Sequence, residues 1–291
     1  MNTHKIKSAL LLAACILSAA AQHSFGQVLI TSNPNPNYSS LQLWLKADAG
    51  VTSSGNGTEV TAWANQSTSG VAVGGATALT GGGSGATLVS SSSGLNNQAA
   101  LNFNGTNQGY NLPTWDLMTG SNFTMFTVIR QSSNTGVQVM LSAGSNIYAG
   151  FDGYLLYQTD VEYSTALSAP NVLLGNTSYV TSITHNGTAA GGTDLFVDGI
   201  QSDSGAAVLD VSTIGIGSIG YQYNLGTRWF NGQIAEILVY NSSLSDSERL
   251  SVTGYLGDKY GISAVPEPSS LALLGLAVTG MLIAVRRRRA S

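Results

Sequence analysis

Short apolar segments separated by turn dipeptides run along the chain from residue 41 to residue 240. Asn-Gly and Asp-Gly pairs close several of them, and such pairs favour the left-handed backbone of tight hairpin turns. Many short strands at this spacing are typical of a β-sandwich or β-barrel. The sequence therefore predicts an all-β domain with strands at 41–46, 60–64, 99–103, 123–130, 137–142, 147–151, 154–158, 179–185, 193–197, 212–217 and 232–240.

Two of the expected strands, 123–130 and 234–240, carry apolar residues on both faces. Successive side chains of a strand point to opposite faces. In the first strand, one face carries Phe123, Met125 and Ile129. The opposite face carries Phe126 and Val128. Strands of this kind are covered on both sides, so we expect both to be central.

One α-helix is expected at the end of the domain. Ser245 and Glu248 have the spacing of a capping box, in which each residue satisfies a backbone N–H group of the other. Gly261 suits the left-handed residue that ends a helix, whereas the internal glycines predict a short helix. The expected buried face comprises Leu250, Leu256 and Tyr260.

The chain is poor in charge, because only 9% of its 291 residues are Asp, Glu, Lys or Arg. Residues 28–265 contain five basic and fourteen acidic residues, a net charge of −9. An acidic domain repels phosphate backbones, which argues against a nucleic acid partner. Residues 60–115 contain no charge at all. Within it, residues 67–98 are mostly Gly, Ser, Thr, Ala and Val. They are predicted to be a loop region with one or two weak strands, or a neutral surface for a neutral polysaccharide.

Residues 1–21 have the three parts of a secretory signal peptide: a basic start, an apolar run and small residues. Cleavage is expected after Ala21 or after Gly26. A lipoprotein signal ending at Cys15 is an alternative, and a true membrane span would need about 20 apolar residues. Cys15 is the only cysteine, so the exported chain would have no disulfide and no thiolate site. Residues 22–40 are expected to form a polar lead-in.

The C-terminal residues 263–291 combine three features. Pro266, Glu267 and Pro268 precede an apolar run at 271–285, and a basic cluster follows at the end: Arg286, Arg287, Arg288 and Arg289. The run is expected to form a transmembrane helix, although it is shorter than the usual span. The arginines would hold that end in the cytoplasm and leave the domain outside.

This arrangement resembles the PEP-CTERM sorting signal of bacterial exported proteins. The resemblance implies an exosortase-type processing enzyme as partner, cleavage near the Pro-Glu-Pro motif and transfer to the cell surface or to exopolysaccharide. A plain tail anchor is the alternative.

The middle of the chain resembles concanavalin A-like, laminin-G-like jelly-roll domains over residues 41–262. The resemblance is carried by ordered segments: Leu41 to Asp48, Val60 to Ser67, Ala100 to Gly105, Asn122 to Ile129, Leu195 to Gly199, Phe230 to Tyr240 and Leu244 to Tyr260. It implies two antiparallel sheets, one of them concave. It does not by itself imply a function, because one fold carries many functions.

A glycoside hydrolase needs two carboxylates that flank the scissile bond, and glucanases of this fold place an acidic triplet on one strand. The nearest match here is Asp160 and Glu162, which lack the third acid. Glu236 is expected to be a structural hydrogen-bonding residue rather than a catalytic acid. His185 is predicted to be a strand-end residue, because no triad partners lie near it in the sequence. The catalytic interpretation is therefore the alternative, and a non-enzyme is expected.

Calcium is the one candidate cofactor. Laminin-G-like domains sometimes hold Ca²⁺ at the rim of the sandwich through Asp, Asn and backbone oxygens. Asp152, Asp194 and Asp198 are candidate ligands, although Asp198 is also suited to a hairpin turn.

Sugar binding uses the faces of aromatic rings together with polar groups. The richest cluster of such groups comprises Tyr221, Tyr223 and Trp229, which are the candidate ligand-binding residues. Trp44 and Trp63 are assigned to the core. We therefore expect an exported, non-catalytic binding or adhesion protein that recognises extracellular polysaccharide, with a glycoside hydrolase or a purely structural matrix protein as alternatives.

Overall fold

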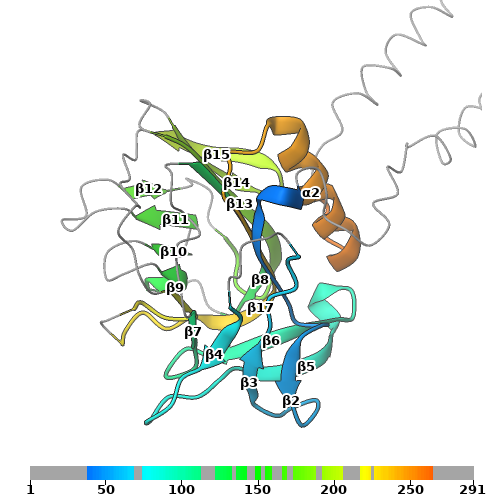
Figure 1. The fold of residues 1–291 in the computed structure, drawn as a ribbon, viewed down its shortest axis with the longest axis vertical. Coiled ribbons are helices and arrows are strands. Elements are labelled where there is room, and N and C mark those ends of the chain that lie inside the picture. Colours follow the sequence, from blue (N-terminus) through cyan, green and yellow to red (C-terminus); the bar gives the residue numbers. More distant parts are fainter. Residues whose placement is uncertain are drawn as a thin grey trace, which may run out of the picture. The chain divides into compact units, whose positions relative to one another are not determined.

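The computed structural model describes residues 38–68, 74–112, 122–132, 136–142, 148–151, 155–158, 166–168, 173–187, 192–205, 217–223 and 226–264. These residues form two antiparallel β-sheets packed face to face, with one α-helix on the outside of one sheet (Figure 1). The predicted all-β sandwich with a single helix near its C-terminal end is therefore confirmed within this part of the chain.

Sheet A has eight strands in the order β15-β14-β13-β8-β17-β6-β5, and β1 pairs with β17 on the side of β6. Their bounds are β1 Leu41–Lys46, β5 Thr87–Ser92, β6 Gln98–Asn104, β8 Asn122–Gln131, β13 Ser178–Asn186, β14 Thr193–Val197, β15 Ile200–Gly205 and β17 Asn231–Tyr240.

Sheet B has nine strands in the order β12-β11-β10-β9-β16-β7-β4-β3-β2. Their bounds are β2 Val51–Ser53, β3 Val60–Trp63, β4 Ala76–Ala78, β7 Tyr110–Leu112, β9 Gln138–Ser142, β10 Tyr148–Phe151, β11 Leu155–Gln158, β12 Ala166–Ser168 and β16 Gly217–Ile219. Short 3₁₀ helices lie at Tyr38–Ser40 and Ser93–Leu95.

Ten of the predicted strands match observed strands to within one or two residues at either end. The eleventh, 212–217, overlaps β16 only at Gly217, and its other residues lie outside the described ones. Six strands were not predicted: β2, β4, β5, β7, β12 and β15. They are short or polar segments built mainly from Ser, Thr, Ala and Asn, which have a weak strand pattern of their own, and β4 and β5 fall within the stretch that was expected to contain weak strands.

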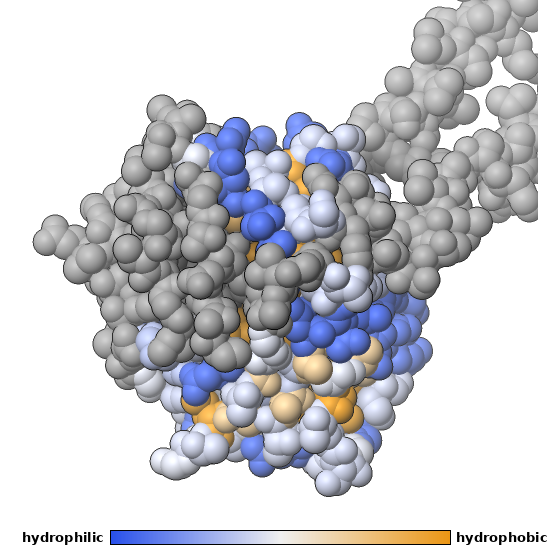
Figure 2. All heavy atoms as spheres, in the orientation of Figure 1, coloured by the Kyte–Doolittle hydropathy of each residue, from blue (hydrophilic) through white to orange (hydrophobic). Residues whose placement is uncertain are grey.

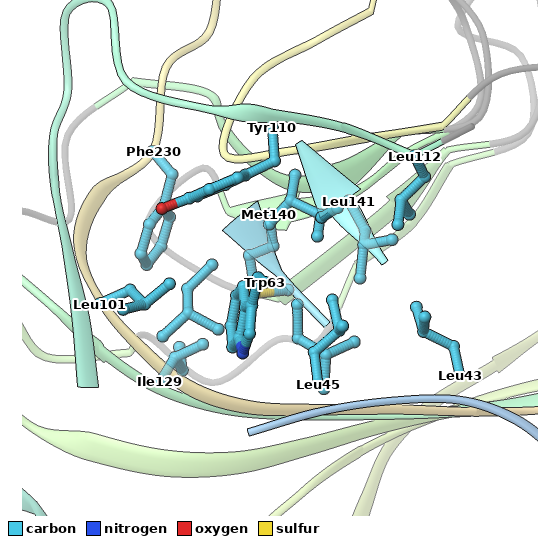
Figure 3. Close-up of a cluster of buried hydrophobic side chains, with 14 of the residues drawn as sticks. Leu43, Leu45, Trp63, Leu101, Tyr110, Leu112, Ile129, Met140, Leu141 and Phe230 are labelled. Atoms are coloured by element: carbon cyan, nitrogen blue, oxygen red, sulfur yellow. The ribbon is translucent and has the colours of Figure 1, made fainter. Parts of the chain in front are cut away.

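The main core lies between the two sheets. Trp63 and Tyr110 from sheet B are fully buried, and their rings meet edge to face with centroids 6.0 Å apart. Figure 3 shows Trp63 among aliphatic side chains from both layers. The polar atoms of both rings are satisfied, since Trp63 Nε1 donates to the Lys46 carbonyl at 2.8 Å and the Tyr110 hydroxyl donates to the Val60 carbonyl at 3.0 Å. Trp63 is therefore the core residue that the sequence predicted.

A second core lies on the other face of sheet A, beneath helix α2 (Asp246–Tyr260). Strand β8 contributes to both cores, as predicted: Phe123, Met125 and Ile129 face sheet B, whereas Phe126 and Val128 face the helix side. Strand β17 is likewise buried on both faces. Trp44 is buried in this second core, which agrees with its assignment to packing.

Helix α2 begins at the predicted capping box. The Ser245 hydroxyl accepts from the Glu248 N–H, the Glu248 carboxylate accepts from the Ser245 N–H, and Gly261 ends the helix with φ 66°. The buried face differs in part from the predicted one, because Leu250 is only partly buried. Its buried residues are Arg249, Val252, Thr253, Leu256, Gly257 and Tyr260.

A β-bulge at Ala235 decides where Glu236 points. The register of β17 against β8 shifts between Ile234 and Glu236, so that Ala235 is an extra residue. A bulge breaks the alternation of faces. Ile234 therefore faces sheet B, while Glu236 lies on the helix side with Leu238 and Tyr240. The unbroken alternation of a regular strand predicts that Ile234 and Glu236 share one face, and this prediction is wrong because of the bulge.

Candidate functional site

Tyr221 and Trp229 form a stacked aromatic pair next to sheet B. Their ring centroids are 5.0 Å apart and their planes differ by 23°. Tyr221 is 6% exposed, whereas Trp229 is partly exposed. Tyr221 therefore supports Trp229 from one side, and the indole is the member of the pair that solvent or a ligand can reach.

The chain after β16 folds back on itself and brings these two residues together. The Gln222 N–H donates to the Thr227 carbonyl at 3.0 Å, and the Phe230 N–H donates to the Gly220 carbonyl at 2.8 Å. Gly220 has φ 84°, and a Cβ there would lie 2.4 Å from the Phe103 ring. The turn thus requires glycine at this position.

Polar groups of sheet B fix the Tyr221 side of the pair. The Tyr221 hydroxyl donates to Asn111 Oδ1 at 2.5 Å. The Ser218 hydroxyl donates to the Tyr221 carbonyl at 2.7 Å, and the Tyr223 N–H donates to the Ser142 hydroxyl at 3.2 Å. Burial, and secondarily the neighbouring Tyr223, raises the pKa of Tyr221 to about 12. The Tyr221 hydroxyl therefore stays protonated and neutral around pH 7.

The residues that hold this segment belong to one row across sheet B. The strand register pairs Thr52 with Ala62, Ala62 with Thr77, Thr77 with Asn111, Asn111 with Ser218, and Ser218 with Ser142. These residues alternate along their strands with residues of the main core, so the row lies on the outer face of sheet B. Ser218 and Ser142 are buried, but Thr52 and Thr77 are exposed, and Ala62 and Asn111 are partly exposed.

Sheet B carries no charge along its described strands. None of β2, β3, β4, β7, β9, β10, β11, β12 and β16 contains Asp, Glu, Lys or Arg. Sheet A, in contrast, contains residues of both signs, among them Lys46, Arg130 and Glu236. In Figure 2 the lower part of the visible surface, around β2–β4 of Figure 1, is mostly pale with small apolar and hydrophilic areas.

Glu236 is the most enclosed carboxylate of the described chain, and its partners are all structural. Its side chain is fully buried beneath α2. Four donors surround it: Trp44 Nε1 and the Tyr255 hydroxyl reach Oε1 at 2.5 and 3.5 Å, and Lys259 Nζ and the Tyr260 hydroxyl both reach Oε2 at 2.7 Å. With every oxygen held and no exposed surface, Glu236 is suited to joining strand to helix, as the sequence indicated, and not to meeting a substrate.

The candidate calcium ligands are not gathered in the part of the chain that is described. Asp194 Oδ1 accepts from Gln201 Nε2 at 2.8 Å, and Asp198 Oδ1 accepts from the Val180 N–H at 2.8 Å. Asp198 also has φ 50° and opens the turn between β14 and β15. Asp152 lies outside the described residues, and within them no three Asp, Glu or His side chains form a group that could hold a metal ion.

His185 lies near the end of β13, opposite Phe123 of β8. The two rings are stacked, with their centroids 5.3 Å apart. It is fully buried, and its Nδ1 lies 2.7 Å from the Thr193 hydroxyl. Burial lowers the pKa of His185.

The other catalytic candidates, Asp160 and Glu162, lie outside the described residues, as do the expected signal peptide and the apolar run 271–285. No helix in the described residues is long and apolar enough to cross a membrane.

Residues 264–289 match the family model described as the PEP-CTERM protein-sorting motif. The chain carries a PEP-CTERM sorting motif. The match includes Pro266, Glu267, Pro268 and the arginine cluster 286–289, as the sequence predicted, and it covers only this end of the chain. A PEP-CTERM motif implies an exported protein that an exosortase-type system sorts to the cell surface. A comparison with curated proteins found no match.

Solved structures similar to the PEP-CTERM chain share its fold at low sequence identity. Domain 4 of AbnA, a GH43 extracellular arabinanase from Geobacillus stearothermophilus solved with arabinotriose, is 16% identical with a TM-score of 0.54, covering 74% of this chain and 97% of that one. The binding domain of Paraclostridial Mosquitocidal Protein 1 is 14% identical with a TM-score of 0.52, covering 76% and 52%. A Trypanosoma rangeli sialidase complex is 15% identical with a TM-score of 0.50, covering 79% and 36%.

These likenesses support the sandwich architecture of the PEP-CTERM chain and extend to the fold alone. Of the candidate site residues, Tyr221 and Trp229 are in contact, and the backbone N–H of Tyr223 donates to the Ser142 hydroxyl. Asn111, Ser142 and Ser218 were missed by the sequence analysis. Asn111 lies between two buried residues of a three-residue strand, and this alternation is the one signal that could have placed it on the outer face.

Proposed function

We propose that this chain is a non-catalytic, carbohydrate-binding protein of the cell surface, and that Trp229 forms the floor of its binding site. The sorting motif accounts for export and surface sorting. The stacked pair of Tyr221 and Trp229 beside an uncharged sheet is the single observation that carries the binding proposal. Trp229 would offer its open ring face to a sugar, while the network beneath Tyr221 holds the pair in place.

The proposed ligand is an uncharged polysaccharide. Binding sites for sugars combine aromatic surface with a few well-placed polar groups. The exposed part of the row, from Thr52 to Asn111, offers hydroxyl and amide groups and no charge. An acidic polymer would find no cation on the strands of sheet B to pair with its carboxylates. A neutral chain that lies across β2, β3, β4 and β7 would lose no charge solvation on contact with them.

The likeness to domain 4 of AbnA guides the choice of the first ligand. That domain was solved with arabinotriose, so arabino-oligosaccharides are a natural starting point for a screen. Neutral glucans and an acidic polysaccharide would extend it. At 16% identity the likeness concerns the fold, and the residues that make contact must come from this chain's own site.

Titration calorimetry of the full chain and of its variants would test the proposal. Trp229→Ala should weaken binding of a neutral oligosaccharide by roughly 10-fold or more, because a central aromatic contact typically dominates an interface. Trp229→Phe should retain part of the affinity. Ile200→Ala is a matched control, since it removes a 54% exposed apolar side chain from sheet A beside the turn that contacts α2.

Three results would contradict the proposal. New reducing ends during incubation with a polysaccharide would favour the glycoside hydrolase alternative, with Asp160 and Glu162 as the first residues to change. Equal affinity in Trp229→Ala and in the unchanged chain would remove the aromatic pair from the site. Failure to bind any member of the screen would favour a structural matrix protein.

A further inference from the structure

The last turn of α2 is the point at which the folded domain meets its sorting motif. Helix α2 ends at Tyr260, and the motif begins at residue 264. Three intervening residues span at most about 11 Å even when extended. Any pull that reaches the domain from its C-terminal attachment therefore passes through residues 261–264, where Ile262 and Ala264 pack against the second core, and then acts on Lys259 and Tyr260. This argument rests on the sorting motif and not on the proposed sugar binding.

A helix pulled from one end is a weak structure. Its hydrogen bonds run along its own axis, and a helix of 15 residues is marginal when it stands alone. The last turn would unwind residue by residue unless side chains tie it to another element. Local opening of this kind begins where packing and side-chain bonds are few.

The last turn of α2 is instead tied sideways at several points. Lys259 Nζ contacts Glu236 Oε2 at 2.7 Å and Asp48 Oδ2 at 3.1 Å. The Tyr260 hydroxyl donates to Glu236 Oε2, and Asn96 Nδ2 donates to the Lys259 carbonyl at 3.2 Å. The helix end is thus bonded to β17, to the segment after β1 and to the turn before β6.

The first turns of the same helix are held differently. Arg249 stacks on the Phe196 ring at 3.6 Å and donates to the Gly199 carbonyl at 3.2 Å. Its acidic partner, Asp246, is 88% exposed, so that this ion pair is a weak surface one. The buried carboxylate, that of Glu236 in β17, instead contacts the C-terminal end of α2.

Glu236 is also placed where the sheet resists peeling. It lies in β17 opposite Val128 of β8 on one side and Lys46 of β1 on the other. A strand with partners on both sides leaves the sheet only when both ladders break. A force that arrives at Lys259 is therefore passed to the middle of sheet A.

We propose that the cluster of Glu236, Lys259, Tyr260 and Asp48 is a mechanical anchor that transfers tension from the C-terminal attachment to the central strands and keeps α2 from unwinding. The anchor holds the sandwich folded when the chain is attached by its C-terminal end and pulled. It predicts resistance that depends on the direction of pulling.

Optical tweezers would test the anchor on the full chain, held by tags added at its two ends. Lys259→Met keeps an apolar stem over the tyrosine rings and removes both ion pairs. Arg249→Met is the matched control, because it removes a buried cation near the other end of the same helix. The unfolding rate of Lys259→Met under constant force should rise about 10-fold or more above that of Arg249→Met, once each is corrected for its loss of stability in denaturant.

The proposal would be overturned if the effect of each substitution on unfolding under force is proportional to its effect on stability in denaturant. If both variants unfold under force as their denaturant stabilities alone predict, the cluster stabilises the fold without any mechanical role. If Lys259→Met does not fold, Tyr260→Phe replaces it in the test, because this substitution removes only the hydroxyl contact with Glu236. Its first unfolding event should then move to a lower force, with an extension that corresponds to the helix, and no such early event should occur in Arg249→Met. Absence of the early event in Tyr260→Phe would likewise contradict the proposal.

Discussion

At the scale of single residues, the fold places its ionisable groups according to the partners it can offer them. Glu236 is fully buried, and four donors surround its carboxylate. Removing one partner of a buried ion pair leaves a charge without compensation, which typically costs about 3–5 kcal/mol. His185 has fewer partners, since its Nε2 is buried without a hydrogen bond, and the neutral form is favoured there.

His185 should make the protein less stable in acid. Burial lowers its pKa in the folded state, so the unfolded chain takes up a proton that the folded chain resists. Stability from this residue is present above the usual pKa of about 6.5 and is lost as the pH falls below it. The free energy of unfolding of His185→Phe, measured in urea, should therefore decline less on acidification. A difference from the parent that is constant with pH would contradict this.

Asp198 should act in the opposite direction over a similar pH range. Burial raises its pKa from 3.8 to about 6, against the lowering effect of the Val180 N–H. The folded carboxyl keeps its proton at a pH where the unfolded one has lost it, so stability is lost as the pH rises through about 6. Asp198→Asn should stabilise the protein at pH 7 by up to about 2 kcal/mol, since the side chain is partly exposed, with no gain at pH 4. Urea titrations at both values would measure the difference.

At the scale of elements, the bounds of α2 follow from the capping residues in its own sequence, and its buried face packs on the second core. The capping box at Ser245 starts the helix and Gly261 ends it. Ser245→Ala should lower the free energy of unfolding by about 1 kcal/mol, because an N–H group of the first turn loses its acceptor. Ser251→Ala, within the helix, serves as the control and should change stability little or raise it. An equal loss in both variants would show that the cap is not the cause.

The strands that could be predicted are those whose own residues form a clear apolar pattern. Strands β8 and β17 are apolar on both faces and were found to within a residue or two. Strands β4 and β7 have three residues each, and partners from distant parts of the sequence define them. The bulge at Ala235 could not be predicted either, because an unbroken alternation and a shifted one fit the residues of β17 equally well.

At the scale of the whole molecule, the candidate site combines segments that are far apart in sequence. The sequence identified Tyr221 and Trp229 by their residue types, and the tight turn between them makes their contact plausible from spacing alone. Asn111 precedes Tyr221 by 110 residues. Its place beneath the tyrosine depends on how β7 pairs with β16, which no local pattern specifies.

The sorting motif governs where the molecule resides. Replacing Pro266, Glu267 and Pro268 by alanine should prevent normal sorting, because the motif is the feature through which an exosortase-type system acts. Fractionation of cells that make the full chain should then show loss of the mature surface form and accumulation of an unprocessed one. Replacing Ser269 and Ser270 by alanine is the neighbouring control. Unchanged fractions in the first variant would mean that another part of the chain directs sorting.

The lack of charge in the strands of sheet B has a consequence for the environments in which the protein can work. No Asp, Glu, Lys, Arg or His lies in these strands, and Tyr221 keeps its proton to a pH of about 12. Nothing in the strands or in the aromatic pair changes its protonation between about pH 4 and pH 9. Asp198, elsewhere in the fold, does titrate in that range, because burial raises its pKa to about 6. Adhesion through this face would thus persist unaltered in acidic and alkaline water alike, for as long as the sandwich itself remains folded.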